Sequence, residues 1–202
     1  RLHVHSALDG TVVNAGVKRY RQLNNKHLEP VQSGKVNEDI IYLLVKTNQS
    51  CIHIAEAART SVYVDGEKND VQRKLMENLG YIAQEFSIDA EQRLPIKIEK
   101  IVSFYTSRDF AISEASQEAT EAVERATNFE ELLQSHILQW DHLWDRCDIQ
   151  LNDNNRTQMI LRLHIFHLLQ SVSRNSIDLD TGVPARGWHG EAYRGHIFWD
   201  EL

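Results

Sequence analysis

The feature that most constrains the fold of this chain is a change of sequence pattern close to Ser113. Before it, short segments rich in β-branched and aliphatic residues, such as IIYLLVKT and IKIEKIVSFYTS, are separated by turn signals such as Asp65-Gly66. Several short strands spaced in this way predict an antiparallel β-sandwich. After Ser113, Ala, Glu and Leu recur at helical spacing. The sequence therefore predicts an α+β chain, with a sheet region first and a helical region second.

Three helices are predicted in the second region. The helical spacing is carried by Ala115, Ala119, Ala122 and Ala126 in the first helix and by Leu133, Ile137, Trp140 and Trp144 in the second. Asn128, with Glu131 three residues later, is typical of a helix N-terminal cap. The third helix, TQMILRLHIFHLLQSVSR, is apolar on most sides, which predicts burial among other helices. Between the strands, NDVQRKLMENLG fits either a short helix or a polar loop.

Composition and charge exclude several functional classes. The 202 residues carry a net charge of -7, whereas nucleic acids and anionic membranes are bound by clustered Lys and Arg. No apolar run approaches the roughly 18 residues that a membrane span requires, and the chain starts at Arg1 without a signal peptide. We therefore expect a cytoplasmic protein that binds neither nucleic acid nor membrane. Cys51 and Cys147 lie far apart in sequence and are expected to be reduced thiols.

The last sixteen residues, GWHGEAYRGHIFWDEL, combine glycines, aromatic rings and carboxylates. A sugar ring has apolar C–H faces and a rim of hydroxyl groups, so a tryptophan plate beside a carboxylate matches it. Trp199 and Asp200 are adjacent in this stretch. The same composition also fits a packed loop with its charges in solvent, and residue spacing alone does not distinguish the two. The third helix has no partner within the sequence, so we expect the chain to be a piece of a longer protein.

The stretch VPARGWHGEAYRGHIFWDEL resembles the start of the catalytic domain in glycoside hydrolase family 65. Upstream, SALDGTVVNAGVKRYRQLNNKHLEP, IEKIVSFYTSRD and WDHLWDRCDIQL resemble the sheet domain and linker of the same family. The family includes maltose, trehalose and kojibiose phosphorylases and some α-glucosidases. The resemblance implies part of an N-terminal β-sandwich at residues 1–112, a helical linker at 113–150 and the start of an (α/α)6 barrel at 151–202.

The resemblance also implies a substrate site in the terminal stretch. Trp199 and Asp200 are expected to bind the glucose that is transferred, and Arg194 and His196 to lie in the same loop. The general-acid glutamate of the family lies beyond Leu202, so no catalytic residue is assigned and this chain alone is expected to be inactive. No metal or organic cofactor is implied. The resemblance points to a homodimer in the full-length enzyme.

The expected activity is that of an inverting α-glucoside phosphorylase that acts on a glucose disaccharide. Inorganic phosphate would be the co-substrate and would attack the anomeric carbon, while one carboxylic acid protonates the leaving oxygen. A hydrolase of the same family is the first alternative, and it needs a second carboxylate as base for water. The second alternative is a non-catalytic carbohydrate-binding module, and the unpartnered third helix argues against it.

Histidines are the other candidate ligands. His164 and His167 are spaced so that one helix face could carry both, with His189 and His196 nearby in sequence. No cysteine or carboxylate completes a four-ligand set at this spacing, so we expect core or surface histidines and no metal. The rings of His3 and His5 are predicted to share one face of a strand, in a structural role.

Overall fold

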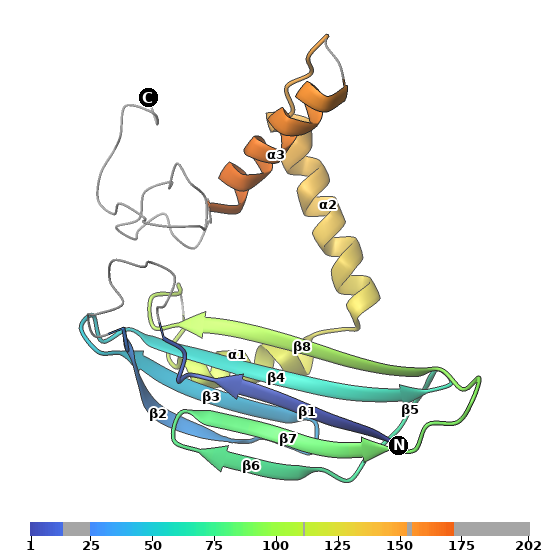
Figure 1. Cartoon of the computed structure of the whole chain (residues 1–202). Helices are drawn as coiled ribbons and strands as arrows, with labels where there is room; N and C mark the ends of the chain where they lie inside the picture. Colours follow the sequence, from blue (N-terminus) through green and yellow to red (C-terminus); the bar gives the residue numbers. More distant parts are fainter. Residues whose placement is uncertain (14–24, 111, 153–154, 172–202) are drawn as a thin grey trace. The chain divides into compact units, whose positions relative to one another are not determined.

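The computed structural model describes residues 1–13, 25–110, 112–152 and 155–171 (Figure 1). Its elements are β1 (Leu2–Asp9), β2 (Leu28–Lys35), β3 (Ile40–Thr47), β4 (His53–Val64), β5 (Glu67–Lys68), β6 (Lys74–Asn78), β7 (Tyr81–Ile88), β8 (Ile96–Thr106), α1 (Ala115–Arg125), α2 (Phe129–Cys147) and α3 (Asn155–Ser171). The predicted order of strands followed by helices is confirmed. The chain forms two compact units, residues 1–14 with 24–132, and residues 15–23 with 133–202.

Two antiparallel sheets form the first unit. Among the described residues, the smaller sheet has the order β1-β7-β6 and the larger has the order β2-β3-β4-β5, with β8 also paired to β4 (Figure 1). Residues 54–59 of β4 pair with β3 and with β8. Because a strand has two hydrogen-bonding edges, β3 and β8 must lie on opposite edges of β4. The predicted antiparallel sandwich is confirmed.

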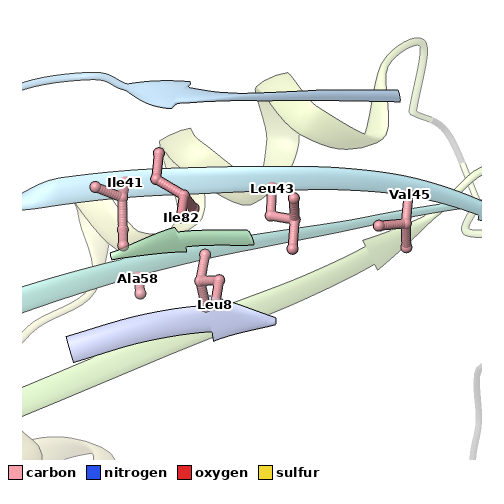
Figure 2. Close-up of a cluster of buried hydrophobic side chains, with 6 residues drawn as sticks. All are labelled: Leu8, Ile41, Leu43, Val45, Ala58 and Ile82. Atoms are coloured by element: carbon pink, nitrogen blue, oxygen red, sulfur yellow. The ribbon is translucent and has the colours of Figure 1, made fainter. Parts of the chain in front are cut away.

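The core of the sandwich follows from the two-residue period of the strands. On β3, Ile41, Leu43 and Val45 point to one face, and all are at most 2% exposed. Leu8 of β1 and Ile82 of β7 face them from the smaller sheet, and Figure 2 shows these side chains between the strands. Residues of both sheets thus make one apolar layer, which excludes water and holds the sheets together.

The outer face of the larger sheet is covered by α1. Ala115, Ala119 and Val123, spaced four residues apart on the helix, pack against Ala55 and Ala57 of β4. Small residues on both surfaces let the helix approach the sheet closely, which explains the alanine repeat seen in the sequence. The helix is anchored at its end, where the Arg59 guanidinium donates hydrogen bonds to the carbonyl oxygens of Val123 (2.8 Å) and Thr127 (2.7 Å).

The turn at Asp65-Gly66 was predicted correctly, and another segment was predicted wrongly. Asp65 and Gly66 have φ values of 51° and 86° and join β4 to β5 as a tight turn. In contrast, NDVQRKLMENLG was expected to be a helix or a loop, and neither is correct, because Lys74–Asn78 forms β6, which pairs with β7. A five-residue edge strand is too short to show a clear strand pattern in the sequence. Its hydrogen bonds to β7 stabilise it as a strand.

The helical cap predicted for α2 is present. The Glu131 amide donates to Asn128 Oδ1 (2.9 Å), and Asn128 Nδ2 donates to Glu131 Oε1 (3.2 Å). Helix α3 covers most of the range predicted for the third helix. None of the helices in the described ranges is long and apolar enough to cross a membrane. Cys51 and Cys147 are free thiols, as predicted.

Candidate functional site

The residues predicted to bind substrate, Arg194, His196, Trp199 and Asp200, lie outside the described residues. The described part of the second unit is α2 from residue 133 onward together with α3, and both precede the predicted site in the sequence. The described part of the first unit is the sandwich with α1.

An aromatic cluster holds the two helices of the hairpin together. The Trp140 ring centroid lies 4.9 Å from that of Phe166 on α3 and 6.2 Å from that of Trp144, one turn further along α2. Ring pairs at such separations are favourable beyond the area they bury. The tryptophans that predicted the helical spacing of α2 therefore also dock α3, through the contact of Trp140 with Phe166.

The connection between α2 and α3 is fixed by polar side chains. Arg162 donates two hydrogen bonds to Asp148, from Nε (2.8 Å) and Nη2 (2.6 Å), and this pairing lowers the pKa of the Asp148 carboxyl. Gln158 accepts from the Leu151 amide (2.8 Å) and donates to the Ile149 carbonyl oxygen (2.9 Å). Two backbone groups of the connection thus bond to Gln158 of α3, which ties the start of that helix to the end of α2.

The histidines of α3 are not brought into a metal site by the described residues. The His167 ring centroid lies 6.1 Å from that of Phe166. Within the described ranges, no group of three His, Cys, Asp or Glu side chains is placed to hold a metal ion. His189 and His196, the other two histidines named as possible metal ligands, lie outside those ranges.

A buried polar network lies in the first unit, and sequence reasoning missed it. The Arg73 side chain is 4% exposed and donates to Gln84 Oε1 (3.0 Å), Asp39 Oδ1 (2.8 Å) and the Thr60 carbonyl oxygen (2.7 Å). Burial lowers the pKa of the Arg73 guanidinium. Asp39 is also bound by Lys68 (2.7 Å). Four segments far apart in the sequence contribute these groups, so no local motif could reveal them. The two terminal nitrogens of Arg73 are bonded as in a structural network, whereas its buried Nε has no hydrogen-bond partner among the described residues.

An open depression of about 910 Å³ borders β1 and β7, and histidines line it. His5 Nδ1 lies 3.1 Å from Glu85 Oε1, His5 Nε2 lies 2.6 Å from the Tyr81 hydroxyl, and His3 Nδ1 lies 2.8 Å from the Ser87 hydroxyl. The prediction that His3 and His5 share a strand face is confirmed by their pairing with Ser87 and Glu85 of β7. Each ring bonds to its cross-strand neighbour, which supports the predicted structural role.

One carboxyl group of the first unit has the property that a general acid needs. Burial raises the pKa of Glu56, although Lys100 nearby opposes the rise. Burial also lowers the pKa of Lys100, whose Nζ donates to the Ala7 carbonyl oxygen (2.7 Å). The register of β4 places Glu56 on the same face as Ala58, toward the other sheet. Glu56 therefore lies on the inner face of the larger sheet, near Lys100.

Two family models and one solved structure match this chain. The family model described as the N-terminal domain of glycosyl hydrolase family 65 matches residues 1–143, and the model for the central catalytic domain of that family matches residues 162–202. A putative kojibiose phosphorylase from the human microbiome has the same fold, with a TM-score of 0.73 over 98% of this chain and 24% of its own, at 20% sequence identity.

Curated relatives agree with the family match. An uncharacterized glycosyl hydrolase of Mycobacterium tuberculosis is 40% identical over 98% of this chain and 15% of its own length. Kojibiose phosphorylase of Thermoanaerobacter brockii is 32% identical over 98% of this chain and 26% of its own. Trehalose 6-phosphate phosphorylase of Lactococcus lactis is 28% identical over the whole of this chain and 25% of its own. The chain thus spans about a quarter or less of these relatives, and it belongs to glycoside hydrolase family 65.

Proposed function

We propose that the full-length protein is a phosphorylase that cleaves an α-linked glucose disaccharide with inorganic phosphate. The observation that carries this proposal is the match of the chain to two successive domains of one carbohydrate-active family. Relatives that are aligned over nearly all of the chain are named kojibiose, trehalose 6-phosphate and α,α-trehalose phosphorylases.

In the proposed reaction, a phosphate oxygen attacks the anomeric carbon of the transferred glucose as the glycosidic bond breaks. A carboxylic acid of the protein gives its proton to the leaving oxygen, so one protein carboxyl group is sufficient. Attack from the face opposite the leaving group inverts the anomeric configuration and yields β-glucose 1-phosphate from an α-glucoside. The reaction needs no metal or organic cofactor.

We assign the glucose-binding role to Trp199 and Asp200, in the motif GHIFWDE. An ionised carboxylate accepts hydrogen bonds from sugar hydroxyl groups, and an indole ring packs against the C–H face of the ring. Arg194 and His196 are proposed to line the same loop. The general acid is proposed to lie beyond Leu202, so residues 1–202 alone should have no activity.

One experiment tests whether phosphate or water accepts the glucose. The purified full-length protein is incubated with kojibiose, trehalose, maltose and trehalose 6-phosphate, each with and without inorganic phosphate. The proposal requires release of β-glucose 1-phosphate from at least one disaccharide, dependent on phosphate. Release of free glucose at an equal rate without phosphate would instead identify a hydrolase, the activity class in the name of the mycobacterial relative. Binding without turnover of any sugar would favour a non-catalytic module.

The site assignment is tested with Asp200→Asn in the full-length protein. Exchanging a charged acceptor for an amide removes a charge-assisted hydrogen bond worth about 1.5–3 kcal/mol. If the bond is stronger in the transition state, kcat/KM falls by roughly 10- to 150-fold, with little change in the melting temperature. Glu124→Gln, an exposed carboxylate on α1, is the charge-matched control and should leave kcat/KM unchanged. Unchanged kcat/KM in Asp200→Asn would remove this residue from the site.

We also propose that the full-length enzyme is a cytoplasmic homodimer, as the family resemblance implies. Light scattering coupled to size-exclusion chromatography measures the mass of the assembly directly. A monomer over the micromolar range would contradict the dimer.

A further inference from the structure

One side of α3 contacts α2 and the connection that follows α2. Gln158 bonds to two backbone groups of this connection, and Arg162 bonds to the Asp148 side chain. One turn further along α3, the Phe166 ring centroid lies 4.9 Å from that of Trp140. Residues four apart are neighbours on a helix surface, so positions 158, 162 and 166 form a single stripe of contacts along α3.

The apolar residues of α3 do not by themselves select this side of the helix. The sequence of α3 is apolar on most sides, and its other sides carry exposed apolar residues, namely Met159, Ile160, Leu163 and Leu168. Apolar contacts are non-directional. They hold α3 against α2 without fixing the rotation of α3 about its axis or its position along α2, so a directional contact is needed to fix both.

The pair of Arg162 and Asp148 is directional. Arg162 donates from Nε to Asp148 Oδ1 (2.8 Å) and from Nη2 to Asp148 Oδ2 (2.6 Å), so the planar guanidinium faces both carboxylate oxygens at once. The Asp148 side chain is only 18% exposed. A slip of α3 by one residue would turn the helix by about 100° and move it by about 1.5 Å, which would break both bonds.

This pair lies where the two domains of the family meet along the chain. The model of the N-terminal domain ends at residue 143, and the model of the catalytic domain begins at residue 162. Asp148 lies between these two ranges, just after α2, and Arg162 is the first residue matched to the catalytic domain. The motif GHIFWDE follows α3 in the sequence. The pair therefore ties the linker to the helix that leads into the predicted substrate site.

We propose that Arg162 and Asp148 are positioning residues for the glucose-binding segment. Their bidentate pair sets the rotation and axial position of α3, and with these the starting point of the segment that carries Trp199 and Asp200. This role rests on the proposed function, because it assigns the pair an effect on turnover in addition to an effect on stability. A misplacement of about 1 Å can reduce the rate of an enzyme about 100-fold, so a contact that fixes a helix can control activity without touching the substrate.

Arg162→Lys in the full-length protein is the principal test. Lysine keeps the positive charge but cannot donate two parallel hydrogen bonds to one carboxylate. We expect kcat/KM for the preferred disaccharide to fall by roughly 10- to 100-fold. The melting temperature should change little, because solvent screens a partly exposed ion pair. Asp148→Asn removes the charged acceptor and should reduce kcat/KM by a similar factor.

Arg125→Lys is the matched control. Arg125 of α1 also pairs with a carboxylate, that of Glu121 at 2.9 Å, and its side chain is 62% exposed. It belongs to the first unit, so the same substitution there should leave kcat/KM unchanged.

The double variant Asp148→Asn/Arg162→Lys shows whether the two residues act as one unit. Either single substitution already breaks the bidentate pair, so the loss in the double variant should equal the larger of the two single losses. Losses that multiply would overturn the proposal. Wild-type kcat/KM in both single variants would also overturn it, even with a lower melting temperature, because the pair would then have only a structural role.

The test separates this proposal from the proposed function. Turnover with water gives the same readout as turnover with phosphate, so the result does not depend on the acceptor. A wild type that cleaves a disaccharide, with variants that match it, would overturn the positioning role alone. A wild type that neither cleaves the four sugars nor binds them in calorimetry would overturn both proposals.

Discussion

Glu99 of β8 caps the first turn of α2, and its replacement by alanine tests how much this cap contributes to the stability of the first unit. The residue is 6% exposed, and its Oε2 accepts a hydrogen bond from the Phe129 amide (3.1 Å). Lys97 Nζ lies 3.2 Å from the same oxygen and also donates to Glu130 (3.1 Å). The first amides of a helix have no acceptor within the helix, so Glu99 acts as a cap contributed by another element.

The expected cost of Glu99→Ala follows from the lost cap. Removing a capping acceptor costs about 1 kcal/mol, within a range of roughly 0.5–2 kcal/mol. A hydrogen bond to a charged group contributes about 1.5–3 kcal/mol. We therefore expect the free energy of unfolding to fall by about 2 kcal/mol, equivalent to about 8 °C in melting temperature for a unit of this size. Glu99→Gln keeps an acceptor for the Phe129 amide and should cost less.

The assay is urea unfolding of the full-length protein, followed by tryptophan fluorescence and circular dichroism, with the midpoint of the transition that includes the sandwich as the readout. Glu130→Gln is the control, because it removes an exposed carboxylate from the same lysine without touching the cap. A midpoint for Glu99→Ala equal to that of the wild type would refute the capping argument. So would a loss in Glu130→Gln equal to that in Glu99→Ala, because the exposed ion pair would then account for the effect.

Three further predictions concern the first unit of the full-length protein. Arg73→Met should cost on the order of 3 kcal/mol, because it leaves the Asp39 carboxylate short of a buried partner. Calorimetry should detect that loss with KM unchanged, and a change in KM alone would point to a binding role. Glu56→Gln should gain stability relative to wild type as pH rises above 4.5, since the folded state binds the Glu56 proton more tightly than the unfolded state does. Urea midpoints between pH 4 and 8 measure the difference, and a constant difference would be inconsistent with a raised pKa. Gly10→Ala should cost about 1–3 kcal/mol, because an added Cβ would lie 2.4 Å from Val45 Cγ1 in the core. An unchanged melting temperature would show that the core side chains move to make room for the added methyl group.

Local patterns in the sequence determined the elements whose hydrogen bonds are local. The alanine repeat predicted α1, and Asn128 with Glu131 predicted the cap of α2, because these signals act within a few residues. The turn at Asp65-Gly66 follows likewise from the tolerance of its residues for positive φ. The predicted substrate residues, including Trp199 and Asp200, rest on resemblance and lie outside the described ranges, so their assignment stays a prediction.

Only the tertiary structure decided which distant segments meet. Lys74–Asn78 is a strand because β7 lies beside it, and nothing in its own pattern required this. Alternation along β8 would place Glu99 among solvent-facing polar residues, yet the Phe129 amide and Lys97 give it a buried position. Arg73 is likewise buried because Asp39 and Gln84 converge on it from other strands and turns. A polar side chain is stable inside a protein only where its partners are, and those partners are set by the packing of the whole sandwich.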